Sequence, residues 1–403
     1  MKPRFRHTRL RRGTRPPREH PLVGQYIDTY LPAVDGVIIT VQNYARWLNA
    51  GHCSCYVAAA EANGYRDADP FPVIRYHSVP LRGRPPYRFG IPRLDMDFRL
   101  NQYRLAPDLV HAHSPFGAGR EALRVARNRR IPLVASFHSK YYDDVLQATG
   151  SERLAAEAVK YVVSYYNKAD YVWTVNQGTA NTLRDYGFHK PVEIVPNGTD
   201  FVMPQDIAAA RRSVEERFRL APETPLLLFV GQHILQKNLP MLLEGVALYK
   251  RFAPGFKLLM VGEGPARPAL EARAAELGLG ADVIFAGVER ERARLSAIYL
   301  RADLFVFPSV YDNAPLVVRE AAMAGCPAVM IAGSNAAENA RDGYNAYLCE
   351  NDPRSLCQAL LRAFADGGKR RRVGEAASRT IAKPWQEIVQ EVYARYAQIL
   401  GRK

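Results

Sequence analysis

The feature that most constrains this chain is a regular alternation of short apolar runs and amphipathic stretches, which starts afresh halfway along the sequence. In the first half the apolar runs predict strands at 22–30, 53–60, 109–114, 131–138, 171–176 and 193–198. In the second half they predict strands at 225–231, 256–264, 283–287, 304–309 and 327–333. Strands that alternate with helices are typical of parallel, doubly wound sheets. We therefore predict an α/β protein with two Rossmann-like domains facing a central cleft.

The boundaries follow from changes in composition. Residues 1–20 form a basic tail that we expect to be flexible, and residues 21–205 form the first domain. Residues 206–382 form the second domain, and the amphipathic run within 383–403 predicts a closing helix that packs across both domains. In paired domains of this type ligands bind beyond the carboxyl ends of the strands. The residues that directly follow the strands are therefore the candidates for chemistry.

Charge restricts the partners. The 403 residues include 55 Lys and Arg against 40 Asp and Glu, a net charge of +15, which favours nucleic acid, anionic lipid or a phosphorylated substrate. The tail has eight basic residues and one acid, without the apolar segment of a signal peptide, so it is either a solvated extension or a tether to an anionic surface. The basic residues outside the tail are scattered and form no nucleic-acid motif.

Cysteine usage favours a reducing, cytosolic compartment. None of the five cysteines forms a CxxC pair, which argues against a disulfide framework and a zinc site. We expect Cys53 and Cys55 to pack as small apolar side chains. No uncharged apolar run reaches the roughly 18 residues that span a bilayer. A cytoplasmic location, with peripheral contact at a membrane, is therefore expected.

The most informative stretch is YDNAPLVVREAAMAG at 311–325. Asp312 precedes a turn that contains Pro315, and Glu320 follows eight positions after Asp312 in a helical pattern. Pro315 suits the first helical position, and the free N–H groups of that first turn can bind phosphate. Glu320 can accept hydrogen bonds from two ribose hydroxyls, and Asp312 from a sugar hydroxyl. The alternative is an ordinary helix with a solvated Glu320.

Weaker signals follow other strands. VGQHILQKN at 230–238 places a strand-ending Gly231 before Lys237, which can reach a diphosphate, and VGEGP at 261–265 is a further strand–glycine turn. In the first half Asp35-Gly36 opens a strand-to-helix turn, and His138 ends a strand toward the same face. Each has a purely structural alternative, namely a solvated lysine, a tight turn or a hydrogen-bonded histidine.

Two DxD patterns raise the question of a metal. Asp67-Ala-Asp69 and Asp95-Met-Asp97 both occur, but the second lies in an Arg-rich loop, where we expect it to be solvated or paired with Arg93 and Arg99. There is no P-loop, HExxH or Gly-x-Ser-x-Gly motif, which argues against most ATPases and hydrolases.

Taken in order, these stretches resemble family-4 glycosyltransferases of the GT-B fold. The resemblance covers nearly the whole chain, from Tyr30-Leu31-Pro32 through FHSKYYDD (137–144) and VPNGTD (195–200) to the helix at Trp385. It implies a retaining, metal-independent transfer of a hexose from a nucleotide-diphosphate sugar, with UDP-glucose as the expected donor and GDP-mannose as the alternative. It implies no further cofactor.

The resemblance also implies a role for each matching residue. Glu320 would hold the ribose, Asp312 the sugar hydroxyls and Lys237 the diphosphate. His138 would lie near the reaction centre, with Asp312 and Lys237 as its catalytic partners. The donor site as a whole would comprise Gly36, Gly231, Gln232, Lys237, Gly262, Val288, Asp312, Asn313, Ala314, Pro315, Leu316, Val317 and Glu320, with Val288 near the base.

Three positions depart from the family pattern. Asp312 replaces the usual Glu, Gln232 replaces an Arg that would bind the diphosphate, and Pro315 replaces a Gly. These changes bear on donor identity and activity. One alternative is therefore a catalytically degenerate GT-B subunit.

The acceptor is indicated by a further resemblance to enzymes that glycosylate membrane lipids such as diacylglycerol. It rests on the VDGV turn, FHSKYYDD and PPYRFGIP (85–92). Basic and aromatic residues alternate over 82–93 and can dock a membrane surface: Arg82, Arg84, Tyr87, Arg88, Phe89 and Arg93. The alternatives are a solvated loop and an enzyme that acts on a saccharide or a small soluble acceptor, as in polysaccharide synthesis.

Overall fold

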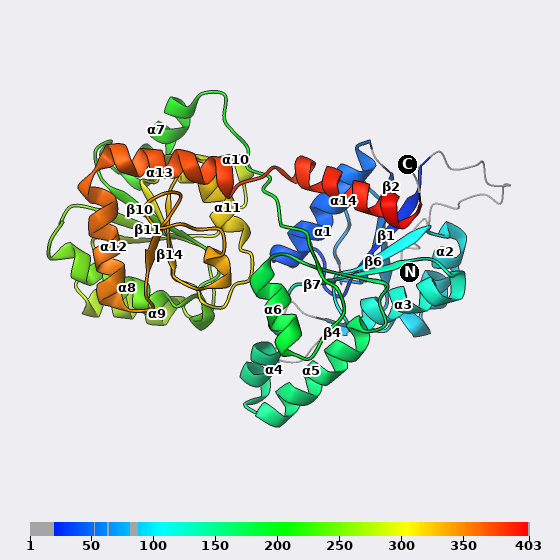
Figure 1. The fold of residues 1–403 in the computed structure, drawn as a ribbon. Helices are drawn as coiled ribbons and strands as arrows, with labels where there is room; N and C mark the ends of the chain where they lie inside the picture. Colours follow the sequence, from blue (N-terminus) through cyan, green and yellow to red (C-terminus); the bar gives the residue numbers. More distant parts are fainter. Residues whose placement is uncertain (1–19, 52, 63, 81–87, 402–403) are drawn as a thin grey trace.

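The computed structural model describes residues 20–51, 53–62, 64–80 and 88–401. They form two α/β halves that lie side by side (Figure 1). The basic tail at 1–19 and Arg82, Arg84 and Tyr87 of the proposed membrane loop lie outside the described residues.

The N-terminal half is built on a seven-stranded sheet with the order β3-β2-β1-β6-β7-β8-β9, in which adjacent strands pair in parallel. Its strands are β1 (Leu22–Ile27), β2 (Ser54–Ala60), β3 (Val73–Tyr76), β6 (Leu109–Ala112), β7 (Leu133–Phe137), β8 (Tyr171–Thr174) and β9 (Glu193–Ile194). Its helices are α1 (Gly36–Asn49), α2 (Met96–Leu105), α3 (Gly117–Arg129), α4 (Tyr141–Thr149), α5 (Glu152–Tyr166) and α6 (Gln177–Asp185). A short antiparallel hairpin, β4 (Ser78–Pro80) and β5 (Arg88–Gly90), and the 3-10 turn η1 (Pro92–Leu94) precede α2.

The C-terminal half is built on a six-stranded parallel sheet with the order β12-β11-β10-β13-β14-β15. Its strands are β10 (Leu226–Val230), β11 (Lys257–Val261), β12 (Val283–Gly287), β13 (Leu304–Phe307), β14 (Ala328–Ile331) and β15 (Tyr347–Cys349). Its helices are α7 (Ile207–Phe218), α8 (Leu239–Lys250), α9 (Arg267–Glu276), α10 (Arg292–Arg301), α11 (Leu316–Met323), α12 (Pro353–Ala365) and α13 (Gly367–Thr380), with 3-10 turns η2 (Leu235–Lys237) and η3 (Asn335–Ala337).

The central strands of each sheet are mostly apolar and buried because helices cover both faces, whereas the edge strands β3, β9 and β12 are partly exposed. The predicted fold class is confirmed: α/β, with two Rossmann-like sheets. All five cysteines are buried and free, as expected for Cys53 and Cys55. Among the described residues no helix is long and apolar enough to cross a membrane.

The chain crosses between the halves at two adjacent segments. The backbone N–H of Thr199 donates to Lys383 O (2.8 Å), and that of Trp385 donates to Thr199 O (3.1 Å). The last helix, α14 (Trp385–Ile399), then returns to the N-terminal half and lies along α1 (Figure 1). The rings of Trp385 and Tyr44 are 6.0 Å apart. The buried residues of α14 pack in the N-terminal core, which Leu316 of the other half joins, so α14 rests on one half rather than evenly on both.

Candidate functional site

The order of the strands indicates where a ligand would bind. In the N-terminal half the direction of strand order reverses at β1, which lies between β2 and β6. In the C-terminal half it reverses at β10, which lies between β11 and β13. Open parallel sheets bind ligands at the carboxyl ends of their strands next to such positions. The candidate residues from the sequence lie mostly in the segments that follow β7, β10, β11, β12 and β13.

Two donor-site residues from neighbouring strands contact each other directly. Lys237 in η2, after β10, donates from Nζ to both carboxylate oxygens of Asp312, after β13, at 2.6 and 2.7 Å. The side chains are 14% and 19% exposed, and Lys237 Nζ also lies 5.6 Å from the centre of the Phe307 ring. Because this ion pair is only partly buried, a single ligand could contact both the Lys237 ammonium group and the Asp312 carboxylate. A diphosphate would compete with Asp312 for Lys237.

The turn after Asp312 leads into α11. Pro315 is the N-cap of α11 and so precedes the first helical position, one residue earlier than the sequence predicted. The N–H groups of Leu316 and Val317 begin the helix, which is the geometry that binds phosphate. Asn313 and Ala314 turn their carbonyls toward the N-terminal half: Asn176 Nδ2 donates to Asn313 O (2.8 Å), and Asn197 Nδ2 donates to Ala314 O (3.1 Å).

Glu320 in α11 is buried and fully engaged, not solvated. Its Oε1 accepts from Arg292 Nη2 (2.7 Å), and its Oε2 accepts from the Tyr299 hydroxyl (2.9 Å). The same Arg292 Nη2 also bonds Asp200, in the segment that crosses between the halves. Arg292 is a residue that the sequence analysis missed, because it lies in α10, far from any motif.

The candidate site glycines Gly36, Gly231 and Gly262 differ in whether the backbone requires a residue without a side chain. Gly262 has φ +136°, and a Cβ there would lie 1.9 Å from Gly231 O, so the turns after β10 and β11 pack backbone against backbone. Gln232 and Val288 are exposed, Val288 directly after β12. Gly36 begins α1, where Asp35 Oδ1 accepts from Val37 N and Ile38 N, and a Cβ on Gly36 would meet no atom within 4 Å. Sterics within the protein therefore do not require Gly36.

His138, directly after β7, lies against the donor loop. Its carbonyl accepts from Asn313 Nδ2 (2.7 Å), and its Nε2 lies 3.1 Å from His113 Nδ1. Burial lowers the pKa of His138 to about 4, so its imidazole is neutral at physiological pH. The structure thus brings His138 to the same turn as Asp312, on opposite sides of the junction between the halves.

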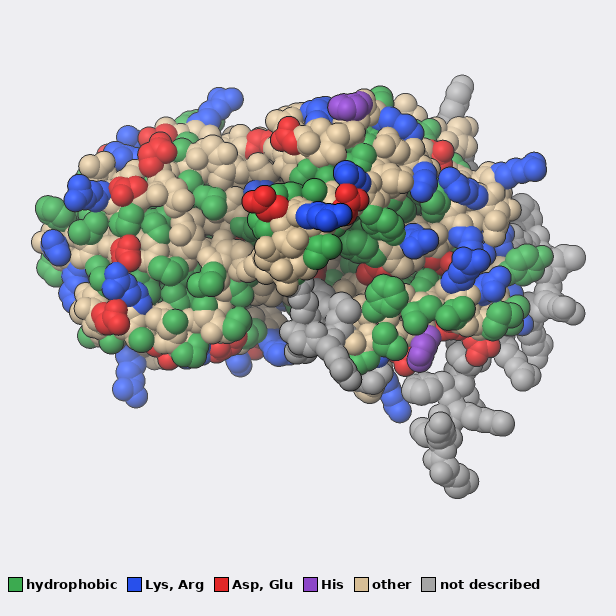
Figure 2. Space-filling model, turned by 90° about the horizontal axis from the view of Figure 1, so that it is seen from below, with side chains coloured by type: hydrophobic (Ala, Val, Ile, Leu, Met, Phe, Trp, Pro, Cys, Tyr) green, Lys and Arg blue, Asp and Glu red, His purple; other side chains and the backbone are tan. Residues whose placement is uncertain are grey.

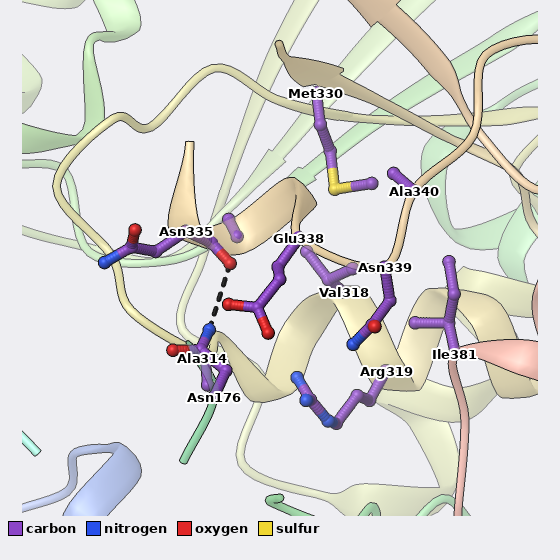
Figure 3. A pocket seen from close by; sticks show the side chains of 11 residues that line it. Asn176, Ala314, Val318, Arg319, Met330, Asn335, Glu338, Asn339, Ala340 and Ile381 are labelled. Atoms are coloured by element: carbon purple, nitrogen blue, oxygen red, sulfur yellow. Dashed lines mark hydrogen bonds between the residues drawn. The ribbon is translucent and has the colours of Figure 1, made fainter. Parts of the chain in front are cut away.

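A small polar cavity of about 10 Å³ marks this junction (Figure 3). Arg319 and Glu338 point into it, and Asn176 Nδ2 donates to Asn335 O (3.1 Å) at its edge. The Glu338 carboxylate accepts from the N–H groups of Gln177 (2.9 Å) and Gly178 (2.6 Å), so it caps α6 of the other half. Arg319 Nε donates to Asn197 O (2.9 Å), and burial lowers the pKa of Arg319 to about 10.

A larger cavity of about 180 Å³ lies in the N-terminal half, beyond the ends of β1 and β2. Its lining includes Asp28, Tyr30, Glu61 and Arg88. Arg88, which the sequence assigned to a membrane loop, donates here from Nε to Ser78 Oγ (2.7 Å).

One acid of each DxD pattern has a structural role, and Asp97 is exposed as expected. Asp95 caps α2 by accepting from Phe98 N (2.9 Å) and also accepts from His77 N (2.9 Å), which corrects the expectation that it is solvated or paired with Arg93 and Arg99. Asp67 pairs with Arg75 at 2.5 Å.

Two family models together match most of the chain. Residues 34–201 match the model of Glycosyltransferase Family 4, and residues 211–380 match that of Glycosyl transferases group 1. The chain is a family-4 glycosyltransferase of the GT-B fold.

Two relatives illustrate its place in the family. The α-monoglucosyldiacylglycerol synthase of Streptococcus pneumoniae is 23% identical over 312 residues, 76% of this chain and 70% of that protein. The GDP-mannose-dependent α-mannosyltransferase of Mycolicibacterium smegmatis is 25% identical over 393 residues, 93% of this chain and 97% of that protein. This glycosyltransferase is therefore a hexosyltransferase of the nucleotide-sugar type.

Solved structures share the fold. Anabaena HepE, in complex with UDP and glucose, has a TM-score of 0.74 at 16% identity and covers 94% of this chain and 99% of its own. Sucrose-phosphate synthase from Thermosynechococcus elongatus has a TM-score of 0.78 at 19% identity, with 95% of this chain and 99% of its own covered. These similarities concern the GT-B architecture.

Proposed function

We propose that this glycosyltransferase moves glucose from UDP-glucose to a lipid acceptor at a membrane surface, with retention of configuration and without a metal ion. The observation that carries the proposal is a patch of exposed apolar side chains on the acceptor half. These side chains lie on the hairpin β4–β5, on η1 and on α2, which follow one another in the described part of the chain: Val79, Phe89, Leu94, Met96, Leu100 and Tyr103. We call this set the α2 patch.

The α2 patch combines apolar and basic side chains. Leu94 and Tyr103 are each 77% exposed, and Arg93, Arg99 and Arg104 are exposed beside them. Figure 2 shows apolar and Lys or Arg side chains intermixed over the N-terminal half. Apolar side chains that enter the lipid headgroup region, flanked by arginines that attract anionic lipid, are typical of proteins bound at a membrane surface. The patch thus favours a lipid acceptor over a soluble one.

The donor chemistry follows from the residues after the strands. When the bond between sugar and diphosphate breaks, negative charge develops on the leaving phosphate. Lys237 and the first N–H groups of α11 would stabilise this charge. The leaving phosphate would then take the proton of the acceptor hydroxyl on the same face of the sugar. Asp312 would hold a sugar hydroxyl, and Glu320 would hold the ribose.

A metal ion is not needed to neutralise the diphosphate in this scheme, because Lys237 and the helix N-terminus supply the positive potential. One acid of each DxD pattern is also engaged elsewhere, since Asp95 caps α2 and Asp67 binds Arg75.

A second donor is favoured by one observation. The GDP-mannose-dependent relative aligns with 93% of this chain, more than the 76% aligned with the diacylglycerol enzyme. GDP-mannose therefore belongs in the same test as the alternative donor.

The test presents radiolabelled UDP-glucose and GDP-mannose to the enzyme with vesicles of diacylglycerol and anionic phospholipid, and separately with soluble sugars. We expect label from UDP-glucose in the lipid fraction, an α-linked product by NMR, and the same rate in EDTA. An Asp312→Asn variant serves as the control for enzyme-dependent transfer. Label only in soluble products, label only from GDP-mannose, or loss of transfer in EDTA would each contradict the corresponding part of the proposal. No turnover of any donor would favour a degenerate subunit.

A further inference from the structure

A chain of buried polar side chains runs from His138 into the core of the N-terminal half. His113 Nδ1 lies 3.1 Å from His138 Nε2, and His113 Nε2 lies 2.8 Å from Gln25 Oε1. Gln25 Nε2 donates to the Tyr396 hydroxyl of α14 (3.2 Å), which lies 2.6 Å from His111 Nδ1. The chain therefore connects the donor loop with the last helix.

The direction of these hydrogen bonds can be worked out from Gln25. Because its amide nitrogen donates to Tyr396, its oxygen must accept, and His113 Nε2 therefore carries a proton. A neutral His113 then has a bare Nδ1, which accepts from His138 only if His138 is protonated at Nε2. On the other side, the Tyr396 hydroxyl accepts from Gln25 Nε2 and forms a hydrogen bond with His111 Nδ1.

Burial requires this order. Gln25 and His111 are fully buried, and His113 is 2% exposed, so an unpaired donor or acceptor among them would cost free energy. Burial is also the first cause that lowers the pKa of His113 and of His138, which keeps both imidazoles neutral. A neutral His138 with a proton on Nε2 has a lone pair on Nδ1. That nitrogen has no protein partner among the described residues.

We propose that His113 is a positioning residue for sugar transfer: it holds His138 in the neutral tautomer protonated at Nε2, so that Nδ1 accepts a hydrogen bond from a hydroxyl of the donor sugar. The presence of a donor sugar beside His138 rests on the proposed function. The tautomer of His138 does not depend on that function. His113 acts through His138 and has no contact with the ligand.

The tautomer is tested by NMR on protein labelled with ¹⁵N-histidine. Two-bond ¹⁵N–¹H correlations at pH 7 distinguish the protonated from the bare ring nitrogen, and a His138→Gln variant assigns the signals. We expect a protonated Nε2 and a bare Nδ1 in the wild type. The Nδ1 signal should shift when UDP-glucose is added and stay in place when UDP is added. A protonated Nδ1 in the wild type would overturn the proposal.

Two variants of one residue test the role in transfer. His113→Asn places an amide oxygen where Nδ1 stood and can still accept, whereas His113→Phe fills the space but cannot accept. We expect His113→Phe to lower kcat for UDP release about tenfold or more, with little change in KM for UDP-glucose, and His113→Asn to stay within about threefold of wild type. Equal rates for wild type and His113→Phe would overturn the positioning role.

If His113→Phe does not fold, Gln25→Met provides the same comparison, because it removes the acceptor that orients His113. A wild-type enzyme that consumes no nucleotide sugar would contradict the proposed function and the role in transfer. The tautomer would then still be decided by NMR.

Discussion

One guanidinium, Arg292, connects the candidate ribose site with the segment between the halves. It bonds the buried Glu320 carboxylate and Asp200 from the same nitrogen. Its Nε is buried without a hydrogen-bond partner, so a ligand oxygen there would satisfy it. The sequence contains no signal for this residue, because its partners are 28 and 92 positions away.

Removal of this cation should weaken both stability and nucleotide binding. In Arg292→Met the Glu320 carboxylate would keep only the Tyr299 hydroxyl, and we expect the free energy of unfolding to fall by about 1–2 kcal/mol, since Arg292 is partly exposed. Urea unfolding and calorimetric titration with UDP measure the two effects. Arg294→Met is the control, because Arg294 forms an exposed pair with Glu291. If both variants behave alike, Arg292 has no special role.

The buried histidines make stability depend on pH. His111, His113 and His138 have pKa values lowered by burial, that of His138 to about 4, whereas an unfolded histidine titrates near 6.5. Below about pH 6.5 the unfolded chain therefore binds more protons than the folded one, so stability falls as the pH falls toward 4. The slope should be about 1.4 kcal/mol per pH unit for each such histidine.

Denaturant unfolding at several pH values checks this. His113→Asn should flatten the dependence between pH 6.5 and 4 by about one histidine. His77→Asn, at a side chain that is 64% exposed, is the control variant. A dependence as steep in His113→Asn as in the wild type would show that His113 is not a buried neutral group.

Helices and strands with strong patterns were predictable from the sequence. β12 (Val283–Gly287) coincides with its predicted run, and α14 (Trp385–Ile399) lies within the amphipathic run that predicted a helix in 383–403. β3, β15 and the β4–β5 hairpin were not predicted, because they are short and their apolar residues show no clear period. Of the candidate site, the strand-end residues were predictable, since parallel strands end at one edge of a sheet.

The contacts that assemble the site could not be predicted in the same way. Asn176 meets Asn313 and Asn335 across the junction, but it lies more than a hundred positions before either of them in the chain, and all three lie in ordinary turns. Lys237 and Asp312 were each singled out, yet their pairing depends on β10 and β13 being neighbours. The hydrophobic pattern of the sequence predicts each helix or strand, whereas the order of the strands in the sheet determines which turns lie next to each other.

If the proposed lipid acceptor is correct, the α2 patch should determine the affinity of the protein for lipid vesicles. Replacing Leu94, Met96 and Tyr103 by Ser should lower binding to vesicles that contain anionic lipid about tenfold or more, because each large apolar side chain contributes on the order of 1 kcal/mol or more at a bilayer surface. Flotation with anionic and with neutral vesicles measures the change. A triple Ser variant of Leu235, Phe252 and Val288, which are exposed on the other half, is the control. Equal losses in both triple variants would contradict a specific lipid-binding face.

The two halves are held together by contacts that run through the site itself. Glu338 caps α6 across the junction, Asn313 bonds His138, and Lys140 Nζ donates to Val310 O (3.1 Å). The turn after β13 and the N-terminal half are therefore brought together by the same bonds that would close the cleft. Closure of this kind excludes water from the reaction and limits hydrolysis of the donor.

Glu338 gives the most direct control over that closure. Glu338→Ala removes two charge-assisted bonds to the N–H groups of Gln177 and Gly178 and leaves Arg319 buried without its nearest carboxylate. Because each such bond is worth about 1.5–3 kcal/mol, the ratio of closed to open molecules should fall at least tenfold. Small-angle X-ray scattering should then give a larger radius of gyration for the unliganded variant, and UDP-glucose hydrolysis should rise relative to transfer. Glu375→Ala on exposed α13 is the control. A Glu338→Ala protein as compact as the wild type, with the same ratio of hydrolysis to transfer, would show that the halves are held by the asparagine contacts and that the carboxylate contributes little to closure.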